Sequence, residues 1–130
     1  MSAPQRVVAT LLFAALPGVA AALGLGGLEV SSGLNQPFDG KIAIVGAKQG
    51  EIADVDARLA EAEAFARAGI ARPYSLTRLR FSVVPTGDDS GYVHITSRES
   101  VREPALEFII EVTWRNGSLQ RKYGVLLERK

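Results

Sequence analysis

The sequence predicts a mainly β protein: a small immunoglobulin-like β-sandwich with one short helix, preceded by a signal peptide. About seven short segments alternate apolar with polar residues, which is the pattern of half-buried strands. Turns containing glycine, proline or asparagine separate these segments, and only one segment is rich in helix formers. Because strands and helices do not alternate, a sandwich is favoured over a parallel sheet. The length of 130 residues gives room for one domain.

The first 22 residues have the parts of a secretory signal peptide. Residues 1–6 carry a single positive side chain, and residues 7–16 are an apolar run. A Pro-Gly pair breaks the run, and Ala20 and Ala22 provide the small residues of a cleavage site. A retained membrane anchor is the alternative, but a span needs about 20 apolar residues. We therefore expect cleavage after Ala22, no membrane span after cleavage, and an exported domain over residues 23–130.

The expected mature chain is electrically neutral and has no cysteine. Removal of the signal also removes Arg6, which leaves equal numbers of basic and acidic residues. A protein that binds nucleic acid or an anionic membrane would carry a basic surplus, so neither partner is expected. Without cysteine the domain can form neither disulfides nor thiolate metal sites. Hydrophobic burial must therefore stabilise it.

Two strands are predicted at the start of the mature chain. Residues 28–31 alternate between apolar and polar side chains, and a turn-forming stretch follows. The glycine-rich residues 23–27 are either a flexible lead-in or the beginning of the first strand. Residues 38–45 form the second predicted strand, and one face of it carries Phe38, Ile42 and Ile44.

Residues 51–60 can be interpreted as strand or helix. One interpretation is a single long helix that continues to Gly69. The other is a strand over about residues 54–59, followed by a short helix over about residues 61–68 that ends at Gly69, a good C-cap. The alternation within residues 54–59 favours the second interpretation.

Four strands, arranged as two hairpins, are predicted in the second half. Strands over residues 76–84 and 92–97 flank a loop of residues 85–91 that is rich in glycine and aspartate. Strands over residues 105–114 and 119–127 flank an Asn-Gly pair, a strong signal for a two-residue hairpin turn. The strand over residues 105–114 is strongly apolar and carries on one face Leu106, Phe108, Ile110, Val112 and Trp114.

Few residues could support catalysis or metal binding. His94 is the single histidine and lies on a predicted strand, where a surface or interface role is typical. Asp88 and Asp89 lie in a turn and bring too few oxygen ligands together for calcium. Neither a nucleophile motif nor a dinucleotide fingerprint occurs. We therefore expect no enzyme: no catalytic residue, no cofactor and no metal.

Four arginines are the candidate contact residues for a protein partner: Arg67, Arg72, Arg78 and Arg80. Arg67 and Arg72 lie in or just after the predicted helix, and Arg78 and Arg80 are expected on one face of the same strand. Arginine is enriched at protein interfaces and forms forked pairs with carboxylates. A solvated face is the alternative interpretation.

Several blocks of sequence, in the same order as in a known family, resemble the bacterial FimV-type pilus assembly proteins. The resemblance covers the whole mature chain. It begins with Leu-Gly-Leu-Gly at residues 23–26 and Ser-Gly-Leu-Asn-Gln-Pro at residues 32–37. It continues in residues 63–73, 79–81, 95–98, 101–104, 108–114 and 123–127.

The resemblance implies an N-terminal periplasmic domain that supports type IV pilus assembly, secretin multimerisation and twitching motility. Its expected partners are envelope proteins of the pilus or secretion apparatus. Full-length members continue with a LysM module, a transmembrane helix and a cytoplasmic tail. Since no LysM sequence occurs in the 130 residues, we expect either a fragment or a short stand-alone form, with peptidoglycan binding only if that module follows.

A carbohydrate- or peptidoglycan-binding module of the cell envelope is the alternative function. Such a module would require exposed aromatic rings on a flat face. The sequence offers one tryptophan and three tyrosines for this purpose. Trp114 lies in the pattern of core residues, which favours the scaffold function.

Overall fold

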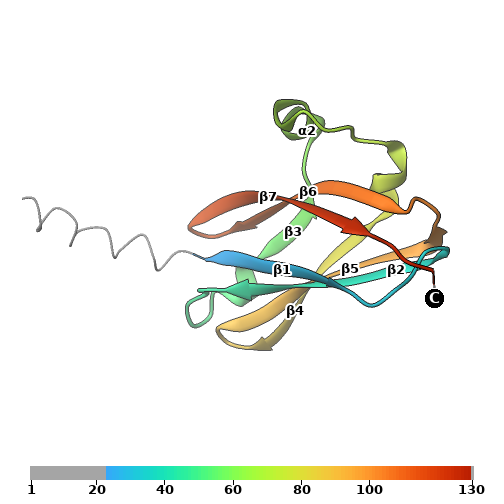
Figure 1. Cartoon of the computed structure of the whole chain (residues 1–130). Helices are drawn as coiled ribbons and strands as arrows, with labels where there is room; N and C mark the ends of the chain where they lie inside the picture. The colour runs from blue at the N-terminus through green and yellow to red at the C-terminus, as the bar shows by residue number, and fades with distance from the viewer. Residues whose placement is uncertain (1–22, 130) are drawn as a thin grey trace, which may run out of the picture.

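The computed structural model describes residues 23–129, which form two antiparallel sheets packed face to face (Figure 1). The first sheet has the order β1-β2-β5-β4 and consists of β1 (Gly24–Val30), β2 (Gln36–Val45), β5 (Ser90–Val101) and β4 (Arg80–Gly87). The second has the order β3-β6-β7 and consists of β3 (Asp56–Leu59), β6 (Ala105–Trp114) and β7 (Gly117–Leu126). The predicted β-sandwich is thus confirmed, whereas the predicted signal peptide lies outside the described residues.

The core lies between the two sheets and is built from alternate residues of the strands. Phe38, Ile42 and Ile44 of β2 are buried, which confirms the face predicted for this strand. On β6, Leu106, Phe108, Ile110 and Val112 are buried as predicted, and Trp114 is half-buried at the end of the strand. The described residues include no buried charged side chain, so apolar packing provides the stabilisation.

The connection from β3 to β4 contains the single α-helix of the described chain. A 3₁₀ turn (η2, Ile52–Asp54) precedes β3, and helix α2 (Ala62–Ala68) follows it. This confirms the strand-then-helix interpretation. Gly69 ends the helix in the left-handed conformation, with φ 73°, as a C-cap glycine does.

Helix α2 packs against β6 from outside the sandwich (Figure 1). Ile109 has the opposite parity to the core residues of β6, yet only 5% of it is exposed. Ala64 and Phe65 are the buried residues of the helix. The helix therefore adds a local third layer that buries an apolar residue on the outer face of the second sheet.

The prediction of a strand over residues 76–84 is wrong for the first residues of this range. A second 3₁₀ helix, η3 (Tyr74–Arg78), occupies this stretch, and β4 begins only at Arg80. Pro73 precedes η3, and its carbonyl accepts a hydrogen bond from the Leu76 N–H at 3.1 Å. Leu76 is 1% exposed, so the turn is retained because it buries this side chain at the entrance to the strand.

Both hairpin turns also differ from the predicted ones: the β4–β5 turn is shorter, and the β6–β7 turn is shifted by one residue. In the β4–β5 hairpin, Gly87 pairs with Ser90, so only Asp88 and Asp89 form the turn that was expected to span residues 85–91. Strand β5 also runs on to Val101, into the expected connector.

In the β6–β7 hairpin, Trp114 pairs with Gly117. The turn residues are therefore Arg115 and Asn116, and the predicted Asn-Gly turn is wrong by one position. Gly117 lies against the Trp114 ring, where a Cβ atom would come within 3.1 Å of a ring carbon. The absence of a side chain at Gly117 thus avoids a close contact with this ring.

Strands β1 and β7 form one flank of the sandwich, and side chains of β7 bridge them. The Tyr123 hydroxyl donates to the Gly26 carbonyl at 2.7 Å, and Arg121 donates to the carbonyls of Leu25 and Gly26. A bulge between Leu25 and Leu28 leaves Gly26 outside the regular β1–β2 pairing. The glycine-rich residues are therefore the beginning of a strand, not a flexible lead-in.

Candidate functional site

The four candidate arginines lie in three different settings. Arg67 is on α2, 3.7 Å from Glu63 one helical turn away, and most of its side chain is exposed. Arg80 is the first residue of β4, and within residues 23–129 its exposed side chain has no hydrogen-bond or ion-pair partner. Both side chains are exposed to solvent, and of the two only Arg67 has an ion-pair partner within residues 23–129.

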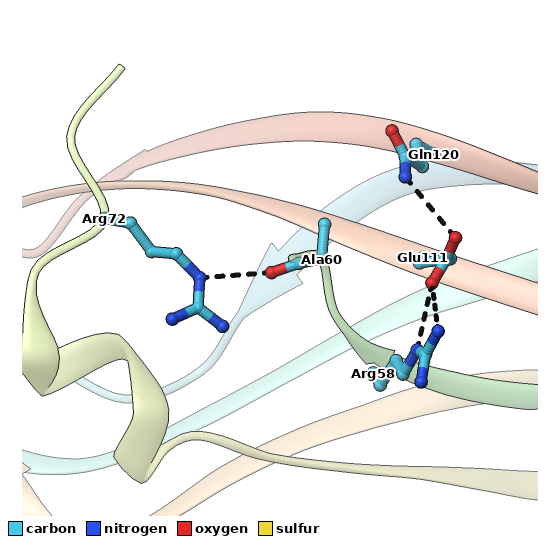
Figure 2. Close-up of polar contacts among 5 residues, drawn as sticks. All are labelled: Arg58, Ala60, Arg72, Glu111 and Gln120. Carbon is cyan, nitrogen blue, oxygen red and sulfur yellow. Dashed lines mark hydrogen bonds and ion pairs between the residues drawn. The ribbon is translucent and has the colours of Figure 1, made fainter. Parts of the chain in front are cut away.

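Arg72 makes its contacts within the fold. Figure 2 shows its side chain directed at the end of β3, where Nε donates to the Ala60 carbonyl at 3.1 Å. Its guanidinium also lies 5.5 Å from the centre of the Phe65 ring, a cation–π distance. Arg72 therefore joins the loop after α2 both to β3 and to the buried aromatic residue of the helix.

Arg78 does not share a strand face with Arg80, in contrast to the prediction. It is the last residue of η3, and it forms an ion pair with Glu99 of β5 at 3.1 Å. Its guanidinium also lies 5.9 Å from the centre of the Tyr74 ring. The 3₁₀ turn thus directs Arg78 toward β5 and away from the face expected from strand alternation.

Arg78 lines a hollow of about 540 Å³ at the end of the sandwich, between η3 and the β5–β6 connection. Arg98 and Arg102 line the same hollow. Strand alternation did not predict that these three arginines meet, because their grouping depends on η3 and on the continuation of β5 to Val101. We call this site the arginine hollow.

A second, shallower hollow of about 360 Å³ lies between β3 and β4. Arg58 and Arg72 line it together with Leu59, Leu79 and Phe81. Arg72 is hydrogen-bonded as described above, and Arg58 is also engaged. Both arginines that line this second hollow therefore already have hydrogen-bond partners within the domain.

Arg58 and Glu111 form a forked pair on the outer face of the second sheet (Figure 2). Arg58 Nε and Nη2 both donate to Glu111 Oε1, at 2.9 and 2.7 Å. The hydrogen bonds from Arg58 lower the pKa of Glu111, and the same bonds raise the pKa of Arg58. The Gln120 amide donates to the other carboxylate oxygen at 3.4 Å. The pair cross-links neighbouring strands.

The single histidine of the sequence pairs with a carboxylate. His94 Nε2 lies 2.9 Å from Asp39 Oδ1, on the outer face of the first sheet. Over residues 23–129 no three side chains of the types His, Cys, Asp or Glu group as metal ligands would. In the same part of the chain, no helix has the length and apolar character needed to span a bilayer.

The aromatic side chains are mostly engaged in packing. Tyr123 is buried, Trp114 packs on Gly117, and the Tyr92 ring has the Lys41 ammonium 5.1 Å from its centre. Tyr74 differs, because 77% of it is exposed beside the arginine hollow. No observation on these rings therefore favours a flat aromatic platform for carbohydrate.

Comparisons with known proteins agree with the resemblance found in the sequence. A family model described as the FimV N-terminal domain, an Ig-like domain, matches residues 23–130. Two curated relatives, from two strains of Pseudomonas aeruginosa, are each named motility hub protein FimV. Each is 40% identical over 111 residues, which cover 85% of this chain and 12% of the relative. The chain therefore spans only about an eighth of these proteins. No solved structure matches it.

Proposed function

This chain belongs to the FimV N-terminal domain family, and on that premise we propose that it is a non-catalytic periplasmic scaffold domain. It supports assembly of the type IV pilus, or of related secretion machinery, through contacts with envelope proteins. The observation that carries the proposal is the match over residues 23–130, together with the name motility hub of the relatives. A binding role is supported by the exposed arginines that line a hollow with apolar residues in its wall.

A domain exchange tests this function. The segment of the Pseudomonas aeruginosa relative that matches residues 23–130 is replaced with those residues of this chain. We expect the exchanged protein to restore twitching to cells that lack the relative, whereas a variant without the segment does not. Normal twitching in cells that carry the shortened variant, at equal protein level, would refute the scaffold role of this domain.

Periplasmic location forms part of the proposal. The supporting observation is the signal pattern of residues 1–22, with small residues at Ala20 and Ala22. We expect the exported protein to begin at Leu23, which the intact mass of periplasmic material measures directly. An uncleaved product that stays in the membrane of an export-competent host would contradict this assignment.

We further propose that the candidate arginines contact the envelope partner, with Arg67 and Arg80 as the residues to test. Arg72 is unsuitable for such a test, because its hydrogen bond to Ala60 means that a variant changes stability as well as the surface. In the exchanged protein, Arg67→Glu with Arg80→Glu should reduce twitching at unchanged Tm. If the folded double variant twitches normally, Arg67 and Arg80 form only a solvated surface.

A further inference from the structure

We propose that the arginine hollow binds an extended segment of a partner protein in which a carboxylate side chain neighbours an apolar one. This inference rests on the proposed scaffold function and adds a second contact surface, separate from Arg67 and Arg80, together with the chemistry of its partner. The proposed surface differs from the one expected from the sequence. It groups Arg78 with Arg98 and Arg102, and it does not include the other candidate arginines.

Apolar residues from separate elements line part of the hollow, beside Ser75, Ser97 and Ser100. Leu76 of η3 and Leu79 just after it are buried, as is Leu106 of β6. Val101 at the end of β5 is partly buried and lines the same space. Tertiary packing holds these side chains in place, so the hollow is preformed and can accept an apolar side chain at little ordering cost.

The rim of the hollow carries an excess of positive charge. Arg78 is paired with Glu99, and Glu103 is the other acidic residue of the lining. The side chains of Arg98 and Arg102 have no hydrogen-bond or ion-pair partner among residues 23–129. Three guanidinium groups against two carboxylates give a local positive charge on a domain that is neutral as a whole.

The unpaired guanidinium groups indicate the charge of the occupant. Arginine offers a planar fork of donors that matches a carboxylate through two parallel hydrogen bonds. A phosphate group would bring about two negative charges close to Glu99 and Glu103, which would repel it. A single carboxylate beside an apolar side chain suits both the rim and the apolar part of the lining better than a phosphate does.

Tyr74 extends the site beyond the hollow. It belongs to η3, is 77% exposed and lies beneath the Arg78 guanidinium. Tyrosine and arginine are enriched among the residues that contribute most to protein–protein binding. A volume of about 540 Å³ falls within the range of small-ligand sites, so the hollow holds a few side chains and not a folded domain.

Fluorescence anisotropy on the exported protein tests the inference. The probe is a short fluorescein-labelled peptide in which glutamates alternate with leucines, and its match has glutamines in place of the glutamates. Arg98→Gln with Arg102→Gln is expected to weaken binding of the glutamate peptide by about tenfold or more, which corresponds to roughly 1.4 kcal/mol. The glutamine peptide is expected to bind as weakly to the original protein as the glutamate peptide binds to this variant.

A control removes two positive charges from the opposite end of the sandwich, where Arg115, unlike Arg98 and Arg102, has an ion-pair partner, Asp54, at 3.1 Å. Lys48→Gln with Arg115→Gln changes exposed residues in the β2–β3 connection and the β6–β7 turn, and it should leave peptide binding unchanged. Equal weakening by both double variants would show that attraction is non-specific, and equal binding of both peptides would show that the rim charges play no part. Either result overturns the inference.

Two further outcomes distinguish a peptide site from a lipid site, and a wrong surface from a wrong function. If the protein sediments with phosphatidylglycerol vesicles and does not bind the peptide, the hollow binds lipid headgroups and the peptide assignment is wrong. If the peptide does not bind while the domain exchange still restores twitching, the scaffold function stands and only the choice of surface fails.

Discussion

The two flanks of the sandwich are closed in different ways. On one flank, β1 and β7 are far apart in sequence, and Tyr123 and Arg121 bridge them by donating to backbone carbonyls some 95 residues away. On the other flank, β3 and β4 are consecutive, and the chain itself connects them through α2 and η3. The β1–β7 flank therefore depends on side chains of β7, whereas on the β3–β4 flank the connecting chain itself holds the two strands together.

Four of the arginines also fall into two classes: those that hold a flank of the sandwich and those that are exposed without a partner in the described part of the chain. Arg121 and Arg72 each donate to a main-chain carbonyl and so serve one flank each. Arg98 and Arg102 serve neither flank, and this makes them available to a partner. Sequence position alone did not distinguish these two classes.

The largest expected effect comes from Phe108, which contacts both flanks. Its ring centre lies 6.1 Å from that of Tyr123 and 6.4 Å from that of Phe81, and the residue is fully buried. Phe108→Ala should lower the free energy of unfolding by about 3–5 kcal/mol, through lost burial and a cavity. Urea unfolding followed by Trp114 fluorescence measures this loss, and a value below about 1 kcal/mol would contradict the shared core.

Tyr123→Phe tests the bridged flank alone. It removes the hydroxyl that donates to Gly26 and keeps the ring, so we expect a loss of about 0.5–1.5 kcal/mol in the free energy of unfolding. Amide exchange should quicken in β1 and stay unchanged in β3. Uniform changes in both strands would show that the two flanks are not independent.

Tyr123→Phe should also change how stability depends on pH in the alkaline range. Burial raises the pKa of Tyr123 above its ordinary value of 10.0, although the nearby Arg121 opposes the shift. A raised pKa in the folded state means that the contribution of Tyr123 is complete below pH 10 and is lost as pH rises through the folded pKa. Tyr123→Phe should therefore flatten the fall in Tm above pH 10, and an unchanged profile would assign that fall to other groups.

Arg72→Ala tests the covalently connected flank and should have a smaller effect. Loss of its hydrogen bond to Ala60 and its contact with Phe65 should cost about 0.5–1 kcal/mol, since the side chain is exposed. Limited proteolysis between β3 and β4 should quicken, because the loop after α2 is released. Arg67→Ala is the matched control and should leave both readouts unchanged, given that its one ion pair is exposed.

The smallest expected effect concerns Glu111 of β6, which pairs with Arg58 of β3 within the second sheet. Hydrogen bonds from Arg58 lower its pKa below the ordinary value of 4.5. Its contribution is therefore present above pH 4.5 and lost as pH falls through the lowered pKa. Glu111→Gln should reduce the acid dependence of Tm slightly, and a larger effect than that of Tyr123→Phe would reverse the expected order of the two contacts.

Local patterns in the sequence were enough to identify most strands and the faces they bury. Alternation placed β6 over residues 105–114 with its core face correct, and helix formers followed by Gly69 placed α2. These features depend on periodicity and capping, which act over a few neighbouring residues. The resemblance of blocks along the mature chain likewise identified the family, because it requires only the order of residues.

The places where polar groups meet depend instead on tertiary contacts. Residues 76–79 alternate as a strand does, yet burial of Leu76 keeps residues 74–78 in a 3₁₀ turn and redirects Arg78. Gly117 was expected in the turn but lies at the start of β7, against the Trp114 ring. Arg98 and Arg102 join Arg78 because β5 runs longer than its alternation indicated. In each case contacts between distant segments outweigh local preference, since burying a large side chain gains more free energy than a turn or strand propensity of under about 1 kcal/mol.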